Sequence, residues 1–209
     1  MANICDKVWS RCGRMSAMLL ACVFAVLGMS RTFGANVELI DNGDMERLSD
    51  GRPQGWGGTM VVENGNHFLR LVQQTPGDMP MVYRRVDLPK DLGAYEQIDL
   101  SMRGRVTGLV KGVESWYDAR VMINVKSADG KTLSSPNISF GKDTGWTERH
   151  TYIKLSAGAA YLEIMPTLFR VNAGTFDFDD FHAVFVDPTG DIIPPVTTGL
   201  GAADMLHVD

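Results

Sequence analysis

The stretch Tyr117-Asp118-Ala119-Arg120-Val121-Met122-Ile123-Asn124-Val125 decides the fold class of this chain. Its odd positions are apolar or aromatic, and the even positions between them hold charged or polar residues and one methionine. Successive side chains of a β-strand point to opposite faces of a sheet. The alternation therefore predicts a strand with one buried face and one free face, and it places Arg120 and Asn124 together on the free face.

The same period of two recurs from about residue 37 to residue 186, interrupted by turn signals such as Asn64-Gly65, Asp129-Gly130 and Thr144-Gly145. Many short strands separated by turns are typical of a β-sandwich or barrel. No segment shows the apolar spacing of a long amphipathic helix. Strands are predicted over residues 37-40, 59-63, 67-73, 80-86, 95-105, 117-127, 132-139, 147-155, 160-168 and 175-186.

The first 35 residues have the pattern of a secretory signal peptide. Lys7, Arg11 and Arg14 precede an apolar run from Met15 to Met29, which is shorter than a bilayer span requires. All three cysteines lie in this segment, so the exported domain would have no disulfide. These features predict a secreted or periplasmic bacterial protein with no stable membrane insertion after cleavage. The alternatives are a lipid anchor on Cys22 and a retained membrane helix.

The rest of the 209 residues is predicted to form one domain over residues 36-188, followed by a linker-like tail over residues 189-209. The net charge of −5 gives no basic surface for nucleic acid, so we expect no nucleic-acid partner. The chain lacks the Gly-x-Ser-x-Gly, His-Glu-x-x-His and Gly-x4-Gly-Lys-Ser/Thr signatures. We therefore expect no enzymatic activity.

Two acidic, turn-like stretches lie near opposite ends of this domain: Asn42-Gly43-Asp44-Met45-Glu46 and Gly174-Thr175-Phe176-Asp177-Phe178-Asp179-Asp180-Phe181. In the second stretch the aromatic alternation slips by one residue at Asp179-Asp180, which predicts a β-bulge that re-aims a carboxylate. Ca²⁺ prefers carboxylate and carbonyl oxygens, and irregular backbone can present both. The alternative is that these acids only hydrogen-bond turn amides. The candidate calcium ligands are Asp44, Glu46, Asp179 and Asp180.

Aromatic and polar residues predict a surface for sugars, because sugar rings stack on Trp and Tyr while their hydroxyls pair with Arg, Asn and Glu. Trp116 is the main candidate, since its parity places it on the side of Arg120 and Asn124. Glu163, in another predicted strand, opposes apolar neighbours and can line the same surface. The alternative for Trp116 is a loop residue that caps the core.

Two further tryptophans, Trp56 and Trp146, each follow a glycine at the entry to a predicted strand. A large ring at such a position can close the end of a sandwich. Both are predicted to be core residues.

The order and spacing of five motifs resemble those of the carbohydrate-binding modules of families 4, 9 and 22. The motifs are the first acidic stretch, Gly55-Trp56, Trp116-Tyr117-Asp118-Ala119-Arg120, Gly145-Trp146 and Phe176-Asp177-Phe178-Asp179-Asp180-Phe181. These are galactose-binding-like jelly rolls found beside secreted glycoside hydrolases, and the resemblance covers roughly residues 37-186. It implies an all-β sandwich, a jelly roll with glycan binding on a sheet face or at loop tips. It also implies a structural Ca²⁺ with Glu46 and the Asp179-Asp180 pair as ligands, although Met45 replaces the usual aromatic residue.

The leading hypothesis is therefore non-catalytic binding of a polysaccharide or oligosaccharide by a secreted module. One alternative is an extracellular structural or adhesion module that binds a protein partner. Another is the N-terminal module of a longer glycoside hydrolase. The residues proposed to contact the glycan are Trp116, Arg120, Asn124 and Glu163.

Overall fold

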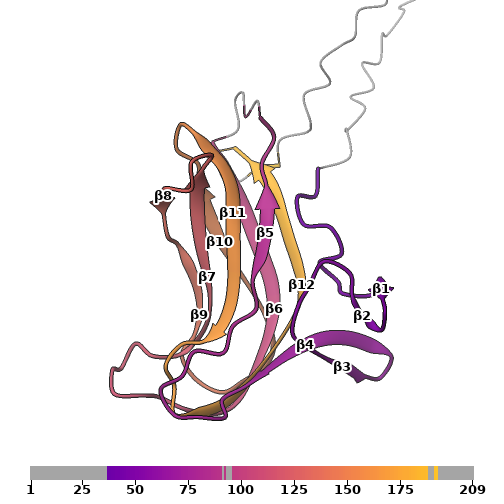
Figure 1. Ribbon diagram of the computed structural model, residues 1–209, viewed down its shortest axis with the longest axis vertical. Coiled ribbons are helices and arrows are strands. Elements are labelled where there is room, and N and C mark those ends of the chain that lie inside the picture. Colours follow the sequence, from indigo (N-terminus) through magenta and orange to yellow (C-terminus); the bar gives the residue numbers. More distant parts are fainter. Residues whose placement is uncertain (1–36, 91, 93–95, 188–190, 193–209) are drawn as a thin grey trace, which may run out of the picture. The chain divides into compact units, whose positions relative to one another are not determined.

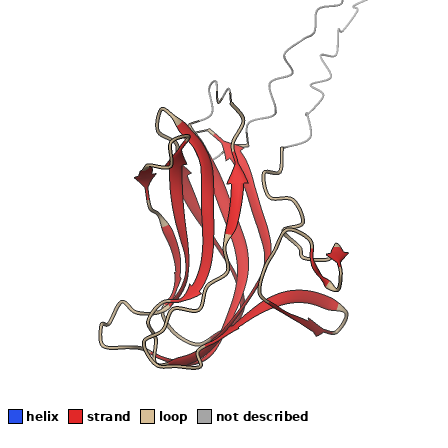
Figure 2. Ribbon diagram, in the orientation of Figure 1, coloured by secondary structure: helices blue, strands red, loops and turns tan. Residues whose placement is uncertain are grey.

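The computed structural model describes residues 37–90, 92, 96–187 and 191–192, and the regular structure in these ranges is β-strand (Figure 1, Figure 2). Two antiparallel sheets of five strands form a β-sandwich, which confirms the predicted fold class. This part of the chain contains no helix that could cross a membrane. The predicted signal peptide and most of the predicted tail lie outside the described residues.

The sheets combine strands that are distant in sequence. In spatial order, the first sheet consists of β10 (Thr144–Lys154), β6 (Gln97–Val110), β12 (Ala173–Val186), β4 (Asn66–Val72) and β3 (Thr59–Glu63). The second sheet consists of β5 (Arg84–Asp87), β11 (Ala159–Leu168), β7 (Ala119–Ser127), β8 (Thr132–Ser134) and β9 (Asn137–Phe140), with β8 and β9 both paired to β7. A short ribbon, which the sequence did not predict, is formed by β1 (Leu48–Ser49) and β2 (Arg52–Pro53).

The core lies between the sheets, and the alternation seen in the sequence determines which residues enter it. Val121 and Ile123 of β7 are fully buried, while Asn124 between the inward positions stays partly exposed. In β6, Leu100 and Met102 are likewise fully buried. Burial of these apolar faces provides the main stabilisation of the fold.

The predicted strand at residues 37-40 is wrong, because a side chain takes the place of a backbone partner there. The carboxylate of Glu38 accepts from the N–H of Ala183 at 2.7 Å and from the N–H of Ile40 at 3.0 Å. Leu39 still donates to the carbonyl oxygen of Ala183 at 2.9 Å. The segment therefore lies beside β12 without forming a regular ladder with it.

Three other predicted strands differ most in their bounds. The strand predicted at 132-139 is split into β8 and β9 around Pro136, which cannot donate to a ladder. The strand predicted at 80-86 is reduced to β5, preceded by an isolated bridge between Met81 and Thr167. The strand predicted at 95-105 continues as β6 to Val110.

The predicted bulge in the last strand is confirmed. The register of β12 against β6 shifts between Asp179 and His182, and Asp180 has a φ of 50°. The extra residue restores the inward parity, so Phe178 and Phe181 are both fully buried. The bulge also gives Asp179 and Asp180 different surroundings.

Candidate functional site

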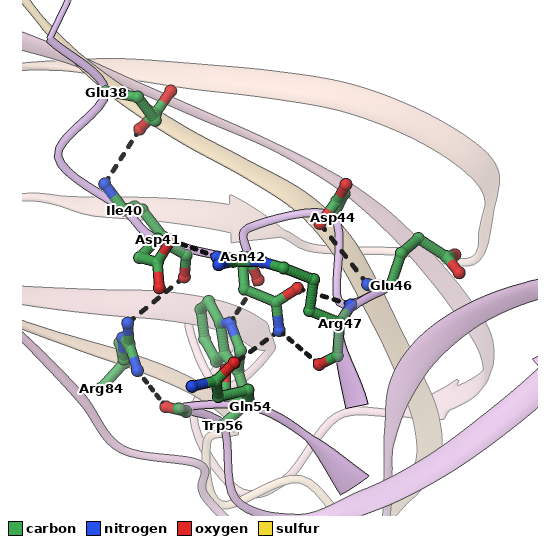
Figure 3. A network of polar contacts seen from close by, with 11 residues as sticks. Glu38, Ile40, Asp41, Asn42, Asp44, Glu46, Arg47, Gln54, Trp56 and Arg84 are labelled. Carbon is green, nitrogen blue, oxygen red and sulfur yellow. Dashed lines mark hydrogen bonds and ion pairs between the residues drawn. The ribbon is translucent and has the colours of Figure 1, made fainter. Parts of the chain in front are cut away.

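The side chain of Asn42 organises the first acidic stretch (Figure 3). Its amide nitrogen donates to the carbonyl oxygens of Arg47 and Gln54, both at 3.0 Å, and its amide oxygen accepts from the N–H of Arg47 at 2.8 Å. Trp56 Nε1 donates to the carbonyl oxygen of Asn42 at 2.8 Å. Asn42 also adopts a φ of 55°, a conformation that asparagine tolerates better than most residues. This asparagine is thus a structural residue of the turn.

Gly43 and Trp56 join this turn to the last strand. The carbonyl oxygen of Gly43 accepts from the N–H of Phe181 at 3.0 Å, and a Cβ at Gly43 would collide with the backbone of Phe181. The Trp56 ring lies 5.0 Å from the Phe181 ring and is almost fully buried, which confirms its prediction as a core residue. Met45 is buried as well. We call this contact between residues 42–46 and the bulge of β12 the terminal clasp.

The structure gives all four expected calcium ligands protein partners of their own, and three of them are at least partly exposed. Glu46 accepts from the N–H of His67 at 2.9 Å, and its other carboxylate oxygen lies 2.6 Å from His67 Nδ1. These hydrogen bonds, the backbone one first, hold the pKa of Glu46 below its usual value. Asp180 pairs with Arg103 at 3.0 Å, and Asp44 accepts from the N–H of Glu46 at 3.4 Å.

Asp179 is the buried member of this set, with only 1% of its surface exposed. It accepts from Asn66 Nδ2 and from the N–H of Asp180, both at 2.8 Å. Burial raises the pKa of Asp179 to about 6, and the charges of Asp180 and Glu46 also raise it, while the two hydrogen bonds act in the opposite direction. Within the described ranges, Asp179 forms no ion pair.

A buried carboxylate near a second carboxylate fits a hard cation. In the part of the chain that the structure describes, no three Asp, Glu, His or Cys side chains form a metal-binding group. An ion beside Glu46 and Asp179 would therefore need amide or main-chain oxygens as further ligands. The turn at Asn64-Gly65-Asn66 adjoins Asp179 and carries such oxygens, which suit Ca²⁺. Calcium binding stays a prediction.

All four residues predicted to contact a glycan lie on the outer side of the second sheet. The even positions of β7 and the odd positions of β11 point to this side, and the register places Glu163 opposite both Asn124 and Arg85. We call this surface the open face. Its principal residues are Trp116, Arg120, Asn124, Glu163, Tyr161 and Arg85.

An aromatic cluster forms one end of the open face. The Trp116 ring, which is half exposed, lies 4.6 Å from the Tyr117 ring and 5.6 Å from the Phe169 ring. The Arg120 guanidinium lies 5.9 Å from the Trp116 ring and 5.0 Å from the Phe169 ring, and it also donates to the carbonyl oxygen of Trp116. Asp118, which is buried, holds the same guanidinium. The tryptophan is thus fixed in place with part of its ring open to solvent.

A connected set of polar side chains forms the middle of the open face. Asn124 Nδ2 donates to Glu163 at 3.0 Å, and the Tyr83 hydroxyl donates to the other carboxylate oxygen of Glu163 at 3.1 Å. Ser135 donates to the Asn124 amide oxygen at 2.9 Å. Hydrogen bonding and burial raise the pKa of Tyr83, with burial the larger cause, so this hydroxyl keeps its proton at neutral pH. Hydrogen-bond donors and acceptors are therefore fixed in position on one surface, where a ligand can reach them.

The other end of the open face is formed by a second stacked pair. The Arg85 guanidinium lies 3.7 Å from the centre of the Tyr161 ring, and Asp87 orients this arginine through a 2.8 Å contact. Tyr161 is opposite Lys126 in the register. At roughly 3.3 Å per strand residue, the distance along β7 from Arg120 to Lys126 is on the order of 20 Å, which exceeds the length of a single sugar ring.

Sequence reasoning did not assign Tyr83, Arg85 and Phe169 to this surface. Tyr83 and Arg85 reach it through the pairing of β5 with β11, and Phe169 reaches it through a hydrogen bond from its N–H to the carbonyl oxygen of Asp118. The sequence showed which residues of a strand share a face, but it did not show which strands pair with each other. A period-two pattern alone does not show which strands are neighbours.

Trp146 is not a core residue, so that prediction is wrong. The register of β10 against β6 is regular from Thr147 to Lys154 and buries Ile153, so alternation carried back from Ile153 places Trp146 on the outer side of the first sheet. There its ring lies 5.2 Å from the Phe68 ring in an edge-to-face arrangement.

The geometry of the sandwich can be compared with that of known proteins. The chain is similar in structure to carbohydrate-binding modules. The xylan-binding domain CBM22-1 of Paenibacillus barcinonensis Xyn10C matches at 14% identity over 74% of this chain and 97% of that chain, with a TM-score of 0.45. The family 11 carbohydrate-binding module of the cellulosomal cellulase Lic26A-Cel5E of Clostridium thermocellum matches at 14% identity over 73% of this chain and 97% of that one, with a TM-score of 0.47.

A further match is the enzymatically active domain of bacteriophage CBA120 tailspike protein 4, at 12% identity over 72% of this chain and with a TM-score of 0.52. The match spans 22% of the tailspike chain. At this identity the likeness extends to the fold alone. No protein-family model matches the chain, and no curated protein sequence matches it.

Proposed function

We propose that this chain is an exported, non-catalytic module that binds a polysaccharide along the open face. One observation carries the proposal: side chains from β7, β11 and β5 form a continuous surface with the half-exposed Trp116 ring at one end, the Arg85 guanidinium stacked on the buried Tyr161 at the other, and hydrogen-bonding groups between them. A glycan chain can present an apolar ring face to such a tryptophan and hydroxyl edges to such polar groups.

The roles of individual residues follow from their positions. Trp116 stacks against one sugar ring, and Arg120 donates to hydroxyls beside it. Glu163 accepts from hydroxyls near the middle of the chain, while Asn124 can both donate and accept. Because Tyr83 and Asn124 already hold Glu163 in place, little side-chain entropy is lost when a glycan binds.

We also propose that a Ca²⁺ ion stabilises the terminal clasp, held by Glu46 and Asp179 with amide or main-chain oxygens. The buried Asp179 without an ion-pair partner among the described residues supports this ion. The ion would be structural, since the clasp and the open face involve different residues. The signal-peptide pattern supports export to the periplasm or the medium.

Affinity electrophoresis of the full chain tests the binding proposal. Native gels are cast with xylan, mixed-linkage glucan, galactan or galactomannan, and the Trp116→Ala and Arg120→Ala variants are run beside the parent protein. Tyr152→Ala is the matched control, because it removes a half-exposed aromatic ring from the first sheet. We expect at least one polysaccharide to retard the parent and the control but not the two variants. Equal retardation of all four proteins would remove the proposed surface.

A second candidate is a binding module that works within a larger enzyme. The tailspike likeness favours it, because there the same fold forms part of an enzymatically active domain. Incubation with the same polysaccharides, followed by an assay for reducing ends, tests whether the chain itself cleaves them. Binding without product release fits a non-catalytic module in either setting, whereas product release would contradict the non-catalytic proposal.

A further inference from the structure

The outer side of the first sheet contains a second set of aromatic and polar residues that the proposed glycan surface does not involve. Phe68 has only 1% of its surface exposed, although it points away from the space between the sheets and is not part of the main core. Trp146 covers it from β10, and the guanidiniums of Arg70 and Arg105 lie 5.7 and 5.4 Å from its ring centre. This side of the sandwich is therefore not a plain solvated face.

A network of ion pairs keeps these groups in place. Asp177, which is 2% exposed, accepts two hydrogen bonds from Arg70 and two from Arg105. Arg105 also pairs with Glu63 at 2.9 Å, and its guanidinium lies 4.8 Å from the Trp146 ring. The bidentate Arg70–Asp177 pair, in which two N–H groups reach the two carboxylate oxygens, fixes side-chain direction as well as charge. The indole of Trp146 is consequently held rigidly before any ligand arrives.

A hollow of about 270 Å³ opens next to this indole. Two aromatic rings form part of its wall, and carboxylates, amides and one guanidinium form the rest. The residues that line it are Glu63, Asn64, Asn66, Phe68, Arg103, Trp146 and Asp179. The hollow is smaller than the roughly 300–1,000 Å³ typical of pockets for drug-sized ligands, so its size suits one ring rather than a chain.

The charges around the hollow disfavour an anionic ligand, and among the described residues its one lining carboxylate without an ion pair is Asp179, which is also a proposed calcium ligand. Each of the three arginines beside it already has a carboxylate partner: Arg70 and Arg105 pair with Asp177, and Arg103 pairs with Asp180. No guanidinium of this group is left without a carboxylate to recognise an anionic group. A neutral ring with several hydroxyls can instead stack on Trp146 and hydrogen-bond to the amides and carboxylates of the rim.

We propose that the Trp146 hollow is a second ligand site, which takes a single neutral sugar ring, such as the exposed end of a glycan. This site does not rest on the open face, since it lies on the other sheet of the sandwich. The outer sides of the two sheets point in opposite directions. A module with both sites can hold two glycan chains, or two parts of one branched glycan, at the same time.

Nuclear magnetic resonance titration of the full chain tests the site directly. The indole N–H signal of Trp146 is assigned by its loss in the Trp146→Phe variant, and glucose, galactose, mannose and xylose are titrated separately in CaCl₂ and in EDTA. We expect a saturable shift of this signal with at least one of the sugars. In Arg103→Met, which keeps the apolar stem of a half-exposed residue, the affinity should fall about tenfold.

The controls separate this inference from the proposed function. Trp116→Ala should leave the Trp146 shift unchanged, because it alters only the open face. Loss of polysaccharide retention in that variant together with an intact Trp146 shift supports both sites. An indole signal that none of the four sugars moves would overturn the second site. So would a sugar affinity that Arg103→Met leaves unchanged.

Discussion

The terminal clasp and the open face use polar side chains in different ways. In the clasp, the Asn42 side chain hydrogen-bonds to backbone groups of Arg47 and Gln54, and Trp56 is buried against Phe181. On the open face, Asn124 and Glu163 bond to other side chains and stay partly exposed. Groups bonded to buried backbone stabilise a fold, whereas side chains bonded to one another at a surface can exchange partners with a ligand.

This difference shows why the most distinctive motif of the sequence is not the binding surface. The turn at residues 42–46 is specified by backbone requirements: a left-handed asparagine, a glycine with no room for a Cβ and an indole that reaches back to the turn. The residues proposed to bind a glycan follow only an ordinary strand alternation. Substitutions in the clasp should therefore change stability, and substitutions on the open face should change binding.

The largest effect is expected for Trp56→Ala. Removal of this buried ring leaves a cavity against Phe181 and takes away the hydrogen bond to the Asn42 carbonyl, so the free energy of unfolding should fall by about 3–5 kcal/mol. Urea denaturation followed by circular dichroism measures this loss. Trp116→Ala is the matched control and should cost less than about 1 kcal/mol, since its ring is half exposed. Equal losses in the two variants would contradict the contrast between the regions.

Asn42→Ala should have the next largest effect. It leaves the carbonyl oxygen of Gln54 and the N–H of Arg47 without their Asn42 partner, while the carbonyl oxygen of Arg47 still accepts from the N–H of Gln54, so the free energy of unfolding should fall by about 2–3 kcal/mol. Binding to the polysaccharide that retards the parent chain should be unchanged at temperatures where the variant is folded. The same denaturation experiment and a native gel run below the unfolding transition provide both readouts.

Removal of calcium should have a moderate effect. An ion bound only by the folded state stabilises it by about 2–3 kcal/mol when its concentration is near 100 times its dissociation constant. EDTA should thus lower the melting temperature, and added CaCl₂ should restore it. The double variant Glu46→Gln with Asp179→Asn should show no response to either addition. If the parent chain melts at the same temperature in EDTA and in CaCl₂, the clasp does not hold an ion.

The smallest effect is expected for Tyr83→Phe on the open face. The change removes only the hydroxyl that donates to Glu163, so polysaccharide affinity should fall about threefold with little change in stability. Calorimetric titration measures the affinity. A loss of stability without a loss of affinity would assign Tyr83 to the fold and not to the surface.

Much of the sandwich could be predicted because burial selects alternate residues in each strand. The inward direction of Val121 follows from the alternation of its strand, and the bulge at Asp179-Asp180 follows from a one-residue shift in that alternation. The strand expected at residues 37-40 failed because parity cannot show that the Glu38 carboxylate competes for backbone N–H groups. Apolar alternation describes which faces are buried but not how each ladder bond is made.

The candidate site was predictable only within single strands. Trp116, Arg120 and Asn124 could be grouped because they are close in sequence and occupy even-numbered positions, which alternation places on one side of a strand. Arg85 joins them through strand pairing, which depends on the whole topology. Trp146 was misplaced because its position after a glycine at a strand entry outweighed its parity: alternation carried back from the buried Ile153 puts residue 146 on the outer side.

The most direct test of the central claim is the affinity of a variant altered in both the aromatic and the polar part of the open face. Trp116→Ala combined with Glu163→Ala should be titrated calorimetrically with the polysaccharide that retards the parent chain, and its melting temperature measured in the same buffer. Loss of detectable binding with a melting temperature close to that of the parent is the predicted result. Undiminished affinity in this double variant would show that the open face does not bind the glycan.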